Sequence, residues 1–175
     1  MTEKENDNLL ILVDANDKVT GFRNKLEVHQ HGLLHRAFSV FIFNSKGELL
    51  LQKRDVSKYH SGGLWTNTCC SHPLKNEELS IAVKRRLKEE MGIDCQTDFQ
   101  FTFIYKAEVG NGLTEHELDH VFFGYSDEFP KLNLNEASDW KYISKKDLEN
   151  EIKNNPVNYT AWLKICWSEI EKKWK

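Results

Sequence analysis

The sequence predicts a mixed α/β (α+β) fold, in which a mixed β-sheet is covered by helices on its faces. Three observations lead to this prediction: short β-prone runs separated by turn residues come first, a helical stripe and two longer strands follow, and helices end the chain. At 175 residues with 39% hydrophobic residues, the chain can bury a core as one domain without disulfide or metal support.

Two β-hairpins are predicted in the N-terminal half. Each joins two β-prone runs across a turn, at Asn16-Asp17 in the first hairpin and at a turn ending on Gly47 in the second. The four runs are residues 9–13, 19–22, 37–43 and 48–52. A polar segment carrying three histidines separates the hairpins, and a loop with the flexible pair Gly62-Gly63 follows them.

One helix, further strands and two terminal helices complete the predicted order. Residues 77–91 place apolar side chains on one helical stripe that ends at Gly92. Two strand-like runs, residues 99–109 and 117–125, flank a Gly-Asn-Gly turn. A last short strand is expected at 140–143, then a helix capped by Ser144 and ending near 152, then a helix at 159–174.

Composition and charge exclude several classes of protein. The net charge of −3 and the lack of a basic tract argue against nucleic acid or an anionic membrane as a partner. Residues 1–8 are polar and acidic, and no window approaches a membrane-spanning length, which predicts a cytoplasmic protein. In a reducing compartment we expect free thiols at the four cysteines, Cys69, Cys70, Cys95 and Cys166.

The segment Asn-Thr-Cys-Cys-Ser-His-Pro at residues 67–73 is the densest group of chemically capable side chains. A cysteine and His72 lie two residues apart among polar residues and Pro73, as is typical of a strand end or loop where side chains converge. The alternative is that the thiols only pack, because free cysteine is often buried.

Histidines and carboxylates form a second candidate site. Glu115 and Glu117 point the same way if their segment is a strand, because side chains at i and i+2 share a face. Together with His29, His35 and His72 they would make a nitrogen and oxygen site suited to zinc, manganese or iron rather than to magnesium alone. The alternative is that these are surface residues that never meet.

Charged side chains form two further groups. On the helix, Arg85 and Arg86 precede Glu89 and Glu90 by four residues, a spacing typical of a solvated helix face. Ahead of the glycine loop lies a local cationic group that could hold a phosphate, although such groups are often solubilising surface. It consists of Lys53, Arg54 and Lys58.

Three aromatic residues have two possible roles. Trp65, Tyr105 and Trp162 are typical core residues. They would instead stabilise a substrate that passes through positive charge if their π faces lined its pocket.

The helix and its approach resemble the Nudix box. The match places box residues at Glu77, Arg85 and the pair 89–90, and departs at Ser71, where the box has glycine, and at Arg86, where it has glutamate. In Nudix hydrolases the box carboxylates gather the magnesium ions that drive attack of water on a diphosphate. A cation at Arg86 therefore indicates different chemistry.

Three separated motifs together resemble the type 1 isopentenyl diphosphate isomerase family, a Nudix-fold family, over nearly the whole chain. They are Leu-His-Arg-Ala-Phe-Ser at 34–39, Asn-Thr-Cys-Cys-Ser-His-Pro at 67–73 and Thr-Glu-His-Glu at 114–117. The resemblance implies one Nudix-type isomerase domain over residues 1–175, with a core at about 35–155 and the helix 159–174 packed over the active site. It also implies interconversion of isopentenyl and dimethylallyl diphosphate in isoprenoid biosynthesis.

The resemblance further implies individual roles. Glu117, linked to Tyr105, delivers a proton to C4 and creates a tertiary carbocation at C3, and Cys70 removes a proton from C2. These roles swap in the reverse direction. The implied substrate-binding residues are Arg54, Lys58 and Arg86 for the diphosphate and Trp162 for the cation. The implied ligands of a divalent ion are His29, His35, His72, Glu115 and Glu117.

Two ions and one partner follow from the same resemblance. Glu90 would hold Mg²⁺ with the diphosphate, and a further divalent ion, Mn²⁺, Zn²⁺ or Mg²⁺, would occupy the histidine and glutamate site. We take His29 rather than His31 as its first ligand, and we expect Cys69 to point away from Cys70 and to be structural. The expected partner is a small prenyl diphosphate, and the expected state is a monomer or weak homodimer.

Two other functions compete with this interpretation. A Nudix diphosphate hydrolase would need the box carboxylates and a water nucleophile. A non-catalytic zinc-binding module would use Cys69, Cys70 and His72 as structural ligands, and chelation would unfold it.

Overall fold

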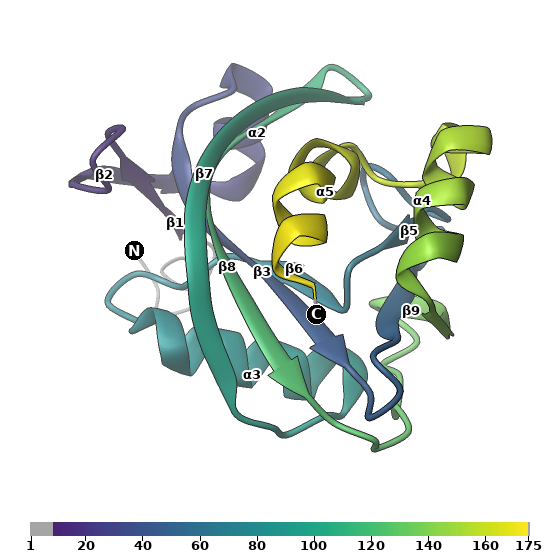
Figure 1. Cartoon of the computed structure of the whole chain (residues 1–175). Helices are drawn as coiled ribbons and strands as arrows, with labels where there is room; N and C mark the ends of the chain where they lie inside the picture. Colours follow the sequence, from purple (N-terminus) through teal and green to yellow (C-terminus); the bar gives the residue numbers. More distant parts are fainter. Residues whose placement is uncertain (1–8, 175) are drawn as a thin grey trace.

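The computed structural model describes residues 9–174, so the polar and acidic segment at residues 1–8 lies outside the described part. Its strands form one mixed, strongly curled sheet, and helices lie on both faces (Figure 1). The predicted fold class, a mixed sheet between helices, is confirmed. No helix of this part is long and apolar enough to cross a membrane.

Strand β3 (His35–Phe43) is the centre of the sheet. It runs parallel to β8 (Leu113–Tyr125) over its whole length and antiparallel to its other partners. Those partners are β1 (Leu9–Val13), β4 (Leu49–Arg54) and β6 (Cys69–Ser71). The outer strands are β2 (Val19–Asn24) beside β1, β5 (Trp65–Thr66) and β9 (Ala137–Ile143) beside β4, and β7 (Thr97–Gly110) beside β8.

The helices are α2 (Lys25–His31), α3 (Leu79–Met91), α4 (Lys145–Asn154) and α5 (Ala161–Lys173), with a 3₁₀ turn, η1 (Pro156–Asn158), before α5. Helix α2 was missed, because its segment is polar. Its end signals are present in the sequence: the Asn24 side chain accepts from the Leu26 amide, and Gly32 takes a left-handed conformation with φ of 57°.

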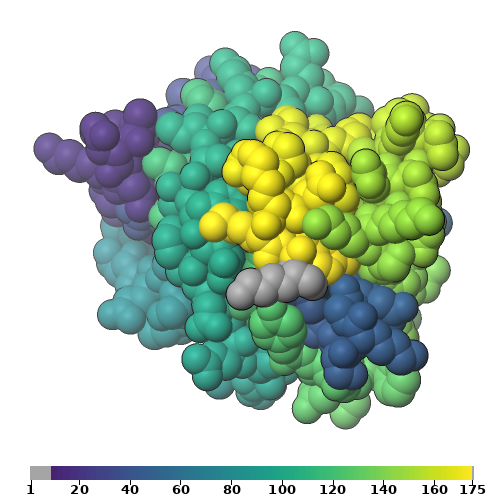
Figure 2. Space-filling view, in the orientation of Figure 1, coloured from purple at the N-terminus to yellow at the C-terminus, as the bar shows by residue number. Residues whose placement is uncertain are grey.

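Alternating side chains of the sheet build two apolar layers. Phe41, Phe43 and Val121 pack against α4 and α5, whereas Val40 and Phe122 on the opposite face pack against α3. Helix α5 lies between β7 and α4 (Figure 1), and its side chains form a continuous surface with theirs (Figure 2).

Several boundaries differ from the predicted ones. Strands β8 and β3 begin earlier than predicted, because His35 pairs with both Leu12 and Glu117, and residues 113–117 pair with β7. Helix α3 begins at Leu79 rather than at 77, because Glu77 uses its carboxylate to accept the Leu74 amide. Because β3 and β8 begin earlier, the candidate metal ligands His35, Glu115 and Glu117 lie on hydrogen-bonded strands rather than in loops.

Candidate active site

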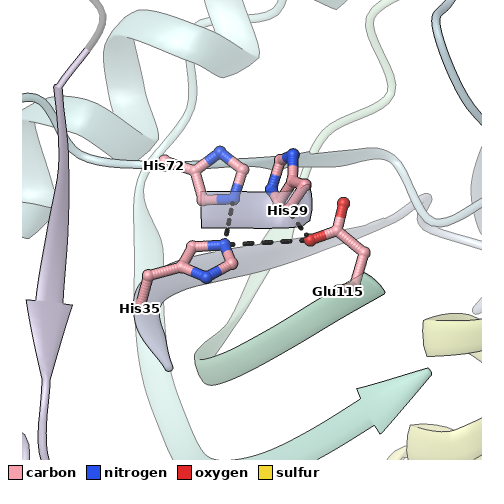
Figure 3. Close-up of side chains that lie close together, drawn as sticks. All are labelled: His29, His35, His72 and Glu115. Carbon is pink, nitrogen blue, oxygen red and sulfur yellow. Dashed lines mark hydrogen bonds and ion pairs between the residues drawn. The ribbon is translucent and has the colours of Figure 1, made fainter. Parts of the chain in front are cut away.

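Four side chains from separate elements converge at one end of the sheet. His29 is in the last turn of α2, His35 opens β3, His72 follows β6, and Glu115 is in β8 (Figure 3). One ligand-type atom from each lies within 4.8 Å of the others, and all four side chains are buried. The structure therefore brings together residues that the sequence separates by up to 86 positions, from 29 to 115.

Distances within this cluster fit a divalent ion. His35 Nε2 lies 3.1 Å from His72 Nε2, and His29 Nε2 lies 3.1 Å from Glu115 Oε2. Donors at about 2.1 Å around one ion are separated by about 3.0 to 3.4 Å, which matches. Within the described residues, His29 Nε2 and Glu115 Oε2 are buried without an aligned hydrogen-bond partner, as expected of atoms that face an ion.

Glu117 connects this cluster to a pocket. Its Oε1 lies 3.0 Å from His72 Nε2 and 3.6 Å from His35 Nε2, while its Oε2 accepts a hydrogen bond from Tyr105 at 2.8 Å. Burial and the negative charge of Glu115 raise the pKa of Glu117. In Glu115 burial acts in the same direction, but the imidazoles of His29 and His60 bring its pKa well below its ordinary value. Glu117 is thus held in an environment that favours its protonated form, and Glu115 in one that favours its ionised form.

The pocket is lined by Cys70, Tyr105, Glu117 and Trp162. Cys70 is half-buried, and its removal from bulk water raises its pKa to about 12, so it rests as a thiol. Cys69 is fully buried in the apolar layer under α3, as expected for the opposite face of β6. The tandem cysteines therefore point to two different environments.

A cationic region adjoins the pocket. Arg54 lines the pocket and, with Lys58 and Arg86, a second cavity beside it. Arg86 bonds Glu90 at 2.7 Å, and Lys58 pairs with Glu136. Glu90 is buried and also accepts from Gln52 at 2.8 Å, so it is not on a solvated helix face.

Trp162 forms one wall of the pocket. Its indole donates to Thr66 Oγ1 at 2.8 Å and to Asn67 Oδ1 at 3.2 Å, which fixes the ring. The Arg54 guanidinium lies 5.2 Å from the ring centroid. Trp65 instead packs beside the core under α4 and α5.

Three residues at the site were not predicted from the sequence. Lys25 lines the pocket and the adjoining cationic cavity, Tyr59 bonds His29, and His60 bonds Glu115. The cap at Asn24 with Glu27 three residues later was the signal that could have placed Lys25 in a helix. Nothing comparable marks Tyr59 and His60, which act from a loop.

The structure bears on two alternatives raised by the sequence, the choice between His29 and His31 and the zinc module built on the cysteines. The exposed His31 uses Nδ1 to contact the Glu27 carbonyl at 2.9 Å, whereas His29 belongs to the cluster. A zinc module that uses Cys69, Cys70 and His72 together does not fit, because Cys69 is buried in the apolar layer under α3 whereas Cys70 and His72 line the pocket.

The NUDIX domain model matches residues 33–163. A Deinococcus radiodurans protein, DR0079, has the same fold, with a TM-score of 0.75 at 17% identity over 95% of this chain and 98% of its own. A MutT protein from Methanosarcina mazei gives a TM-score of 0.66 at 20% identity over 80% and 94%. The fold is thus that of a NUDIX-domain protein.

Relatives with curated names identify one family among the NUDIX-domain proteins. Isopentenyl-diphosphate Delta-isomerase 2 of Aromatoleum aromaticum is 50% identical over 92% of this chain and 85% of its own length. The enzyme of the same name from Photorhabdus laumondii is 51% identical over 95% and 97%. The chain belongs to the isopentenyl-diphosphate Delta-isomerase family.

Proposed function

We propose that the chain interconverts isopentenyl and dimethylallyl diphosphate by moving one double bond. The observation that supports this most directly is one pocket that holds a thiol, Cys70, and a tyrosine-bonded carboxyl, Glu117, and that adjoins a cationic cavity. Such a pocket suits a substrate with an apolar C5 end and a diphosphate end.

His29, His35, His72, Glu115 and Glu117 would hold the divalent ion, and their mix of nitrogen and oxygen favours Mn²⁺ or Zn²⁺. When bound, the ion would withdraw charge from the carboxyl of Glu117 and make it a stronger acid. The buried Glu90 would hold Mg²⁺ shared with the diphosphate.

Glu117 and Cys70 would move the protons. Glu117, held by the Tyr105 hydroxyl, delivers a proton to C4, which leaves a tertiary carbocation at C3, and Cys70 takes a proton from C2. One carboxyl proton is lost and one thiol proton is gained, so Glu117 must take a proton from solvent and Cys70 must release one to solvent before the next turnover in this direction.

The resting state of Cys70 matches one direction of this reaction. Because its pKa is raised to about 12, the resting group is the proton donor needed to convert dimethylallyl to isopentenyl diphosphate. In the opposite direction Cys70 must first release its proton, and the nearby Arg54 guanidinium favours the thiolate.

The carbocation needs a π face and protection from water. Trp162 is buried, fixed by Thr66 and Asn67, and lines the pocket, so it can offer both. Binding of the diphosphate by Arg54, Lys58 and Arg86 supplies binding energy away from the reacting carbons.

A Nudix hydrolase remains the competing function, and the box geometry disfavours it. Arg85 makes two hydrogen bonds to Glu77, at 2.6 and 2.8 Å, and Arg85 and Arg86 both bond Glu89, at 3.2 and 2.8 Å. Glu77 and Glu89 are therefore less available to gather the several ions that attack by water requires, which leaves Glu90 for a single ion.

The test is an assay of the purified chain with isopentenyl diphosphate, Mg²⁺ and Mn²⁺. We expect dimethylallyl diphosphate without release of phosphate, and loss of turnover after chelation with the far-ultraviolet circular dichroism unchanged. Release of phosphate without isomer would establish the hydrolase instead.

A further inference from the structure

Two adjacent residues that the proposed chemistry does not use contact the metal-type cluster from outside. Tyr59 and His60 belong to the loop that connects β4 to β5. The Tyr59 hydroxyl lies 2.7 Å from His29 Nδ1, and His60 Nε2 lies 2.9 Å from Glu115 Oε1. Each therefore contacts one candidate ligand on an atom that does not face the cluster.

The Tyr59 contact selects the form of His29 that can bind an ion. A neutral imidazole carries its proton on one nitrogen and a lone pair on the other. If Nδ1–H donates to the Tyr59 hydroxyl, the lone pair is on Nε2. Nε2 faces Glu115 Oε2 at 3.1 Å and, in the described part of the chain, has no aligned hydrogen-bond partner.

The His60 contact leaves Glu115 with one free oxygen. His60 is buried, and its Nε2–H donates to Oε1, while the Ser61 hydroxyl lies 3.2 Å from its Nδ1 and can donate to it. Oε2 then remains for the ion, as its lack of a partner within residues 9–174 indicates. His60 itself is not among the four convergent ligands.

The loop holds this pair in place. Ser61 has a φ of +52°, which costs energy for a residue with a side chain and persists only where the surroundings fix it. A Cβ on Gly62 would lie 2.7 Å from the Val56 carbonyl oxygen, so this glycine is required by close packing. The Tyr59 carbonyl also accepts from Asn111 at 2.9 Å, which ties the loop to the β7–β8 turn.

The same loop contacts the substrate end of the site. The His60 carbonyl accepts from Arg54 Nη2 at 3.3 Å, and the His60 ring lies edge-on to Trp162 with centroids 6.1 Å apart. His60 thus lies between the candidate ligand Glu115 and two candidate substrate-binding residues.

We propose that Tyr59 and His60 are positioning residues that orient His29 and Glu115 toward the divalent ion. The inference rests on the proposed function, since the ion belongs to it. Partners of this kind fix the ring orientation and tautomer of metal ligands, and their loss typically lowers metal affinity about 10- to 100-fold.

The test is a titration of the metal-stripped full chain with Mn²⁺, followed by electron paramagnetic resonance of the free ion. We expect His60→Ala to weaken binding about 10- to 100-fold and Tyr59→Phe to weaken it about 10-fold. His60→Gln, whose amide can donate to Glu115 Oε1, should bind close to wild type. His31→Ala is the matched control, because this exposed histidine of α2 lies outside the cluster.

Two further results are expected. All variants should still unfold cooperatively without metal, and His60→Ala should regain kcat at saturating Mn²⁺. Wild-type affinity in His60→Ala, or equal loss in His60→Gln, would overturn the proposal. A wild-type chain that binds Mn²⁺ but forms no isomer would refute the proposed function and leave this inference intact, whereas a chain that binds no Mn²⁺ would refute the inference.

Discussion

Tyr105 donates a hydrogen bond to Glu117 Oε2 at 2.8 Å, and the two residues are direct cross-strand partners in β7 and β8. The other oxygen of Glu117 lies 3.0 Å from His72. One carboxyl thus bridges the metal-type cluster and the pocket, in an orientation that the sheet register fixes.

Removal of the Tyr105 hydroxyl should therefore disturb catalysis more than binding. We expect Tyr105→Phe to lower kcat about 100-fold with little change in KM or Mn²⁺ affinity, because a misplaced acid transfers its proton poorly. Steady-state kinetics measures this, with the exposed Tyr125→Phe as the control. A changed KM at an unchanged kcat would contradict the assigned role.

Substitution of the two neighbouring cysteines should have different effects, on kcat for Cys70 and on stability for Cys69. Cys70→Ala should lower kcat by about 10² or more, since it removes one of the two groups that we propose to transfer protons. Cys69→Ala should keep most activity but lower the free energy of unfolding by about 1 kcal/mol, because Cys69 packs under α3. Equal inactivation of both variants, with both still folded, would show that the assignment is wrong.

Trp162 should act through its π face. An interaction of about 2 kcal/mol with a carbocation corresponds to about a 30-fold loss of kcat in Trp162→Leu. Trp162→Phe keeps a ring and should lose less. Trp167→Leu changes the same helix, beside the apolar core rather than in the pocket, and is the matched control. Equal kcat in Trp162→Leu and wild type would exclude cation stabilisation by this ring.

Glu77 should contribute stability that is lost in acid. Its hydrogen bonds with Arg85 lower its pKa below the ordinary value of 4.5. A depressed carboxyl pKa stabilises the fold above that ordinary value, and the contribution disappears as the pH falls through the folded-state pKa. At neutral pH, Glu77→Gln should therefore cost about 1 to 3 kcal/mol.

Urea denaturation at several pH values measures this difference. The gap between wild type and Glu77→Gln should close as the pH falls below the ordinary glutamate pKa of 4.5. Glu149→Gln, on the exposed side of α4, is the control. A gap that stays constant with pH would mean that Glu77 acts by packing alone.

Sequence patterns predicted where the strands and helices lie better than they predicted which strands pair with one another. Alternation and turn residues indicated most strands, because these signals are local. The parallel pairing of His35 with Glu117 joins residues 82 positions apart, from 35 to 117, and no local pattern encodes it. That pairing brings Glu117 next to the histidines.

The burial and contacts of several site residues are set by tertiary packing and could not be predicted from local sequence patterns. The spacing of Arg86 and Glu90 is typical of a solvated helix face, yet Glu90 is buried because α3 turns it toward Gln52 of β4. Tyr59 and His60 carry no motif, since their contacts arise from a tight loop with Ser61 in a left-handed conformation.

Proton exchange between substrate and solvent tests the central claim most directly. The chain would be incubated with isopentenyl diphosphate in D₂O with Mg²⁺ and Mn²⁺, and the product analysed by nuclear magnetic resonance. We expect dimethylallyl diphosphate with deuterium in a methyl group, delivered by solvent-exchanged Glu117, and at least about 100-fold less of it with Cys70→Ala. Isomer without deuterium, or phosphate without isomer, would contradict isomerisation by proton transfer from Glu117.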